Sequence, residues 1–105
     1  MAEISSEIKE LIHKFIDELE ATNIHVQKAV LFGSYARGTN DKWSDIDLAI
    51  VSDNFVGNRY YDNEKIRKAK FAVSYELEPL TYRPEEFNES NPFVREILRH
   101  GINVI

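Results

Sequence analysis

The chain has 105 residues, of which 43% are hydrophobic and 30% are charged, and its formal net charge is −5. This length supports one domain, residues 1–105, with one modest core, and the composition excludes a disordered chain. The absence of cysteine excludes a disulfide framework and a thiolate metal site. The acidic balance argues against a general nucleic-acid-binding protein, because phosphate contacts need a surplus of Lys and Arg.

The sequence also carries no signal for a membrane or for secretion. No apolar run approaches the roughly 20 residues that a membrane span needs. The first seven residues, Met1 to Glu7, contain neither the basic segment nor the apolar segment of a secretory leader. We therefore expect a cytoplasmic protein that does not contact a membrane.

The N-terminal part of the chain predicts a helix over residues 4–19. Ser5 or Ser6 would cap this helix, and Thr22-Asn23 would end it. Seven apolar residues recur on one helical face: Ile4, Ile8, Leu11, Ile12, Phe15, Ile16 and Leu19.

The rest of the chain alternates strands and helices. Apolar alternation, continuous apolar runs and turn residues predict the following order: a strand over 24–32, a helical turn from Ser34 to about Gly38, a loop over 39–44, a strand over 45–51, a loop over 52–58, a helix over 60–72, a strand over 73–82, a helical turn from Pro84, a helix from Asn91-Pro92 to Gly101, and an edge strand over 102–105. This order predicts an α/β or α+β domain with a small mixed sheet flanked by helices.

Two aspartates stand inside the otherwise apolar strand 45–51. Side chains at i and i+2 of a strand point to the same face, about 6.5–7 Å apart, so Asp45 and Asp47 project together. Burying carboxylates is costly unless they are paired or bound to a cation. Oxygen ligands without thiolates favour Mg²⁺, with Mn²⁺ as the alternative. Aspartates that cap neighbouring amides or face solvent at a strand end remain the other interpretation.

A turn before this strand has the features of an anion site. The strand ending at Phe32 runs into Gly33-Ser34 and then a helical turn, which places unpaired amides at a helix N-terminus. Gly33 would let a phosphate approach the main chain, and the Ser34 hydroxyl would add a donor. Many such turns contain glycine for steric reasons alone, so the turn by itself is weak evidence.

The combination is more informative than either part. Gly33-Ser34, ten residues and then Asp45-Ile46-Asp47 resemble the signature of the DNA polymerase β-like nucleotidyltransferase superfamily. The short chain and the length of the spacer resemble its minimal nucleotidyltransferase group in prokaryotes. The C-terminal segment 91–102 is also similar to the closing helix of that group, so the resemblance covers the whole chain.

The resemblance implies a third carboxylate on a neighbouring strand. Asp53 is too far along the chain from Asp47, roughly 20 Å if extended. Glu76 and Glu78 share one face of the strand 73–82. Because Glu78-Pro79 resembles the usual form of the group, we favour Glu78 and keep Glu76 as the second choice.

The resemblance also implies a reaction. A metal-dependent nucleotidyltransferase would move a nucleotide, with AMP from ATP as the favoured case, onto a hydroxyl acceptor. Asp45, Asp47 and Glu78 would be the catalytic and metal-binding residues. Gly33 and Ser34 would bind the β- and γ-phosphates, and Arg37 or Lys42 would neutralise pyrophosphate.

The same resemblance implies a partner. Minimal nucleotidyltransferases resemble the antitoxin halves of toxin–antitoxin modules whose partners are helical HEPN-type ribonucleases, so the acceptor would be a tyrosine of such a toxin. The alternative is a catalytically weak or inactive module that neutralises its partner by contact alone. A nucleic-acid-binding regulator is disfavoured by the acidic balance.

Six other residues gain no role from the sequence. The three histidines, His13, His25 and His100, have no metal-ligand spacing and are interpreted as surface or packing residues. Trp43 is predicted to be buried as a packing anchor rather than to stack on a base. The pair Tyr60-Tyr61 is predicted to close the core.

Overall fold

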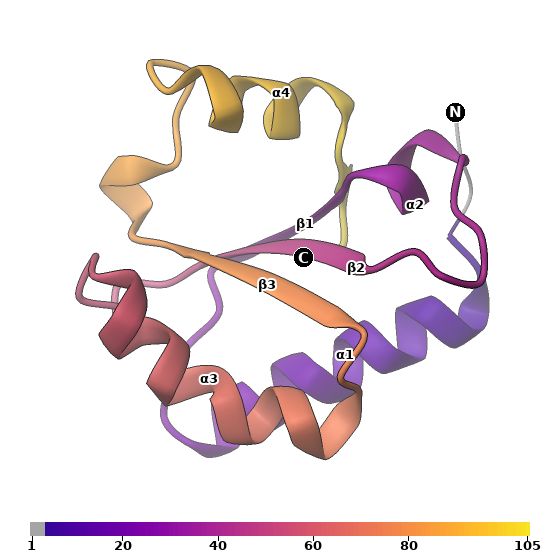
Figure 1. Ribbon diagram of the computed structural model, residues 1–105. Helices are drawn as coiled ribbons and strands as arrows, with labels where there is room; N and C mark the ends of the chain where they lie inside the picture. The colour runs from indigo at the N-terminus through magenta and orange to yellow at the C-terminus, as the bar shows by residue number, and fades with distance from the viewer. Residues whose placement is uncertain (1–3) are drawn as a thin grey trace.

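The computed structural model describes residues 4–105 and contains one four-stranded sheet (Figure 1). The strand order is β3-β2-β1-β4, with β2 and β3 parallel and the other neighbours antiparallel. The strands are β1 Lys28–Phe32, β2 Ile46–Val51, β3 Leu77–Tyr82 and β4 Ile102–Asn103. The helices are α1 Ser6–Ala21, α2 Ser34–Arg37, α3 Arg59–Val73 and α4 Pro92–His100, with a short 3₁₀ turn at Pro84–Glu86. The predicted mixed sheet with flanking helices is confirmed.

Two observations concern leaders and membranes. The prediction of no secretory leader concerned Met1 to Glu7, and residues 1–3 of this segment lie outside the described residues. Over residues 4–105, none of the helices combines the length and the apolar character that crossing a membrane requires.

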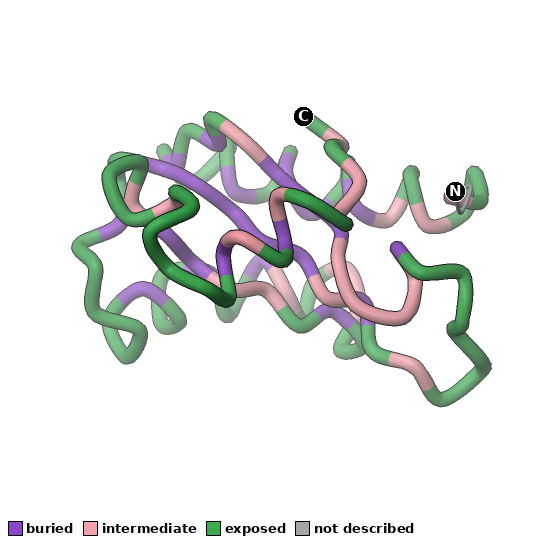
Figure 2. Tube along the Cα trace, turned by 90° about the horizontal axis from the view of Figure 1, so that it is seen from above, coloured by how far each residue is buried: buried purple, intermediate pink, exposed green. Residues whose placement is uncertain are grey.

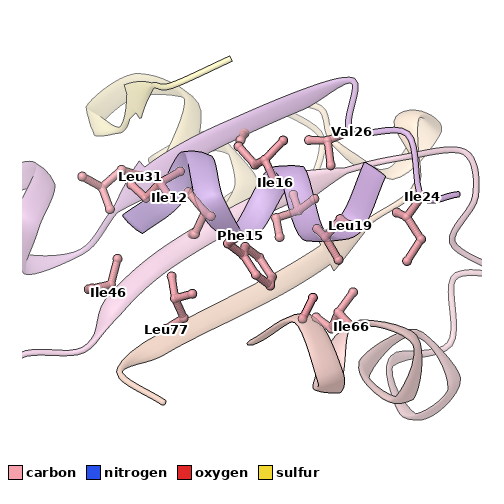
Figure 3. Close-up of a cluster of buried hydrophobic side chains, with 14 of the residues drawn as sticks. Ile12, Phe15, Ile16, Leu19, Ile24, Val26, Leu31, Ile46, Ile66 and Leu77 are labelled. Carbon is pink, nitrogen blue, oxygen red and sulfur yellow. The ribbon is translucent and has the colours of Figure 1, made fainter. Parts of the chain in front are cut away.

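The two faces of the sheet are covered by different helices. Helices α1 and α3 lie against one face, where Phe15 and Ile66 pack with Leu31 and Leu48 in the main core (Figure 3). Figure 2 shows buried residues concentrated in the central strands and on the inner sides of the helices, with exposed connecting loops. Helix α4 packs on the opposite face through Val94 and Ile97. Because α4 is short, it covers only part of that face.

Local signals place the helix starts. The Ser5 hydroxyl accepts the amide of Ile8 at 3.3 Å, so Ser5 rather than Ser6 caps α1. Asn58 caps α3, and Asn91 caps α4 ahead of its first-turn proline. Helix α4 ends at Gly101, as predicted.

All four predicted strands are longer than those in the structure: β2 begins at Ile46, after Asp45, β4 ends at Asn103, and the differences are larger at β1 and β3. Residues 24–27 are not part of β1, although Ile24 and Val26 are buried. Residues 74–76 form a turn between α3 and β3, where Ser74 ends the helix. In both cases the apolar pattern continues into a connection whose side chains reach the core, so hydrophobicity alone overestimates the strand.

The predictions for three aromatic residues are wrong. The exposed fractions are 80% for Trp43, 72% for Tyr60 and 60% for Tyr61. Trp43 belongs to a loop that Asp41 closes by accepting the Trp43 amide at 2.8 Å, which turns the indole away from the core. The two tyrosines occupy the first turn of α3, whose core side is formed by other residues.

A buried aspartate holds the loop after β2 in place. Asp62 of α3 is 1% exposed, and its carboxylate accepts the amides of Val56 at 2.8 Å and Gly57 at 3.0 Å. We expect Asp62→Ala to lower the free energy of unfolding by about 2–3 kcal/mol, because two amides lose a charged acceptor. Urea unfolding measures this loss. Glu64→Ala on the same helix is the control, since Glu64 makes only an exposed i,i+3 pair; equal effects would contradict the prediction.

Candidate active site

A pocket of about 790 Å³ lies on the face of the sheet that α4 only partly covers. Its walls come from five elements and the turns beside them: the end of β1, α2, the start of β2, β3 and α4. The lining residues are Phe32, Gly33, Ala36, Arg37, Asp45, Asp47, Glu78, Pro79, Leu80, Phe93, Glu96, Ile97, His100 and Gly101. The pocket therefore contains most of the residues predicted from the sequence to carry the chemistry.

Strand register explains why the acidic residues meet. Asp47 in β2 lies opposite Phe32 of β1 and opposite Glu78 of β3, so these three residues form one row across the sheet. Neighbouring strands are about 4.8 Å apart, which brings the two carboxylates close together. Asp45 lies two residues before Asp47 and lines the same pocket, as strand alternation predicts. Glu76, the second choice, precedes β3, is exposed and lies outside the pocket lining.

The negative charges act on one another. Burial raises the pKa of the Asp47 carboxyl, the charges of Asp45 and Glu78 raise this pKa further, and Arg37 acts in the opposite direction. Desolvation and like-charge repulsion disfavour the ionised form of Asp47. A cation bound among the three carboxylates would remove this penalty.

The alternative interpretation was that the aspartates face solvent or cap neighbouring amides. Asp45 is exposed, in keeping with the first, but among residues 4–105 neither aspartate performs amide capping. Asp41 performs that function by accepting the amide of Trp43. Among the salt bridges of residues 4–105, none includes Asp45 or Asp47. Glu78 has a distant pair, with 3.9 Å between its Oε1 and the Nζ of Lys70. Both aspartates therefore lie in the pocket without a cationic partner from the described chain.

The turn between β1 and α2 is built around Gly33. Its φ of 75° and ψ of −150° belong to a region that is essentially restricted to glycine. A Cβ at Gly33 would overlap Oδ2 of Asp47 and would lie 3.1 Å from its Cγ. The main chain therefore approaches the Asp47 carboxylate directly. Ser34 is half-buried at the start of α2 and lies outside the pocket lining, whereas Arg37 is exposed and lines it.

The three carboxylates fit a hard cation in their chemistry. All donors are carboxylate oxygens, from β2, from β3 and from the residue just before β2, and they line one pocket, which suits Mg²⁺. With the present side-chain positions, no three acidic or histidine residues within 4–105 are close enough together to bind one metal ion. Asp45 is exposed and the Glu78 side chain is 53% exposed, so both are free to change rotamer.

Helix α4 contributes pocket residues that we did not predict. Phe93, Glu96, Ile97 and His100 form one wall, and the His100 ring lies 3.4 Å from Glu96 in an i,i+4 pair. The Phe93 ring packs edge-on against Phe32, with centroids 5.9 Å apart. The interpretation of His100 as a surface or packing residue is confirmed, since its side chain is 69% exposed, and its place in the pocket lining is an additional finding. The i, i+4, i+7 spacing of these side chains was the available signal, but it does not say which face of the sheet the helix covers.

The family of the chain follows from its sequence. Residues 10–103 match the nucleotidyltransferase domain family. The chain belongs to this family. The nucleotidyltransferase domain therefore occupies most of the described residues, and the pocket with its three carboxylates lies within it.

Three proteins of Methanocaldococcus jannaschii are similar to this nucleotidyltransferase domain, and each is named as a putative protein adenylyltransferase. One is 27% identical over 103 residues, which cover 93% of this chain and 99% of that protein. Another is 31% identical over 75 residues, covering 66% and 51%, and the third is 47% identical over 45 residues, covering 43% and 51%. The matches thus span about half the length of the last two relatives.

Two solved structures share the fold of the nucleotidyltransferase domain. A putative nucleotidyltransferase from Sulfolobus solfataricus has a TM-score of 0.68 at 16% identity, with 92% of this chain and 78% of that chain covered. A toxin–antitoxin structure with AMP-PNP has a TM-score of 0.58 at 22% identity, with 92% and 72% covered. At these identities the similarity concerns the fold.

Proposed function

We propose that this domain is a metal-dependent protein adenylyltransferase that transfers AMP from ATP to a hydroxyl of a partner protein. One observation carries the proposal: Asp45, Asp47 and Glu78 meet in a single pocket beside the Gly33 turn. A turn that admits phosphate and a set of oxygen donors for a hard cation are the two parts that phosphoryl transfer requires. The names of the three archaeal relatives support a protein as the acceptor.

The three carboxylates would bind the metal, and one of them would also take part in proton transfer. Asp45, Asp47 and Glu78 would hold Mg²⁺, which when bound stabilises charge on the attacking and leaving oxygens. The acceptor oxygen attacks the α-phosphorus of ATP, the bond between this phosphorus and the oxygen bridging to the β-phosphate breaks, and pyrophosphate leaves. Glu78, whose side chain is 53% exposed on the edge strand, accepts the proton of the acceptor hydroxyl.

The remaining residues orient the nucleotide. The Gly33 turn, followed by Ser34, binds the β- and γ-phosphates through its main chain, and Arg37 balances the charge of the departing pyrophosphate. Apolar side chains of β1 and α4, Phe32 and Phe93 among them, supply the dry wall of the pocket.

A tyrosine of a HEPN-type helical toxin is our proposed acceptor, which makes this domain the antitoxin of a two-protein module. The fold shared with a toxin–antitoxin structure containing AMP-PNP supports a partner protein and an adenine nucleotide. The motif Gly33-Ser34 with Asp45 and Asp47 supports catalysis rather than contact alone.

Calorimetry with purified protein and each of the four NTPs tests the nucleotide part of the proposal. We expect ATP to bind in the presence of Mg²⁺ and to lose at least tenfold in affinity when EDTA replaces the metal, because the triphosphate and three carboxylates then repel each other. Mn²⁺ should restore binding. No binding of any NTP with either metal would overturn the proposal and favour a module that acts by contact alone.

A further inference from the structure

A second, smaller hollow of about 200 Å³ lies between α3 and β3. It is lined by Asn63, Ile66, Arg67, Lys70, Phe71, Glu78 and Pro79. Two of these residues, Glu78 and Pro79, also line the large pocket, so the two spaces meet at the third carboxylate. In Figure 1, α3 runs beside β3 at the open edge of the sheet, away from α2 and its phosphate turn.

The hollow has a basic wall in an acidic protein. Helix α3 contains five basic residues against two acidic ones, although the whole chain has a net charge of −5. Of the two acidic residues, Asp62 is buried on loop amides, and Glu64 pairs with Arg67 at the surface. Lys70 reaches toward Glu78 from the side of the helix. The lining of the hollow itself contains two cations, Arg67 and Lys70, and one carboxylate, Glu78, so it has a small excess of positive charge.

Exposed aromatic side chains lie beside these cations. Phe71 lines the hollow and is 62% exposed, and Tyr75, in the turn before β3, is 77% exposed. The Lys70 ammonium lies 5.3 Å from the centre of the Phe71 ring. Exposed aromatic residues combined with cations are typical of protein-binding surfaces.

The sheet edge leaves room for an occupant. β3 pairs only with β2, and Glu76 and Tyr82 direct their carbonyls to that neighbour. The hydrogen-bonding groups of successive β3 residues alternate between β2 and the open edge, so those of Pro79 point to the open edge. The amide that Pro79 lacks is therefore not needed for pairing with β2, and its absence disfavours the addition of another strand. Side chains rather than a new strand must therefore recognise what occupies the hollow.

We propose that an acidic segment of the acceptor protein docks in this hollow and presents its hydroxyl to Glu78 from the α3 side. This inference rests on the proposed function, because it assigns the acceptor entrance of the same site. The nucleotide enters from the Gly33 side through the pocket of about 790 Å³, whereas the hollow of about 200 Å³ has room for a side chain. Glu78 would thus lie between ATP in the large pocket and the acceptor segment in the hollow.

A fluorescent random copolymer of glutamate and tyrosine is the probe, followed by anisotropy at low and high salt. We expect wild-type protein to bind it in a salt-dependent manner and to prefer it to a lysine–tyrosine copolymer. Arg67→Glu should weaken binding at least tenfold, and Phe71→Ala severalfold. Lys14→Glu, the same charge reversal on the exposed surface of α1, should stay within twofold.

The outcomes separate this inference from the proposed function. Asp45→Asn/Asp47→Asn should bind the copolymer at least as tightly as wild type, so failed ATP binding leaves the docking result intact. Equal losses in Arg67→Glu and Lys14→Glu, or no binding by wild type, would overturn the inference. Tighter Arg67-dependent binding of single-stranded RNA of equal length would also overturn it and assign the surface to nucleic acid.

Discussion

Replacing both Asp45 and Asp47 with asparagine should remove Mg²⁺-dependent ATP binding, with a loss of roughly 100-fold or more. This ratio corresponds to about 2.7 kcal/mol of binding free energy. The two carboxylates line one pocket with Glu78 and have no cationic partner from the described residues. Asparagine keeps the size of each side chain but removes the charge that would hold the cation. Calorimetry with ATP and Mg²⁺ measures the effect.

Thermal unfolding of the single variant Asp47→Asn, without nucleotide or divalent ions, distinguishes a ligand site from a structural role. We expect Asp47→Asn to leave the melting temperature unchanged or to raise it, because burial and two neighbouring carboxylates oppose its charge. Asp62→Asn is the contrast, since that buried carboxylate accepts two amides. A lower melting temperature for Asp47→Asn would indicate that the aspartate stabilises the fold.

Gly33→Ala should damage both the fold and the site. The glycine has a φ of 75°, and a Cβ there would overlap the Asp47 carboxylate. Left-handed strain together with the displaced side chain should lower the free energy of unfolding by about 2–4 kcal/mol. The displaced carboxylate should also weaken Mg²⁺-dependent ATP binding at least tenfold. Urea unfolding and calorimetry on the same preparation measure the two effects.

Gly57→Ala is the matched control for this experiment. Gly57 also has a positive φ, 88°, but the nearest atom to a Cβ there would be Arg83 Cδ at 3.5 Å, an ordinary contact. This variant should show the backbone strain alone, about 1–2 kcal/mol, with unchanged ATP binding. If both glycine variants weaken ATP binding equally, the close approach of Gly33 to Asp47 has no functional importance.

The placement of Asp45, Asp47 and Gly33 was predictable because each depends on local rules. Extended backbone puts Asp45, just before β2, and Asp47, within it, on one side, and a strand that ends at a glycine before a helical turn predicts the tight turn at Gly33. Glu78 needed more than local rules. Choosing it over Glu76 requires the register between β2 and β3, which the resemblance to a family suggested and the pairing with Asp47 now describes.

The wall formed by α4 was not predictable in the same way. The helical spacing of Phe93 and His100 is visible in the sequence. Which face of the sheet α4 covers depends on the tertiary packing of the helix, which the sequence pattern does not give. The exposed Trp43 was mispredicted for a related reason. Large aromatic residues are highly buried on average, whereas Trp43 is 80% exposed in a loop that Asp41 closes by accepting its amide.

The position of the third carboxylate on an edge strand affects how the site can change. β2 is paired on both sides, so any shift that moved Asp47 would break the register with β1 and with β3. β3 has one neighbour, and a bulge or a one-residue slip there would move Glu78 and leave the rest of the sheet intact. Sequence drift in β3 would therefore move Glu78 while Asp45, Asp47, the core and any contact surface persist.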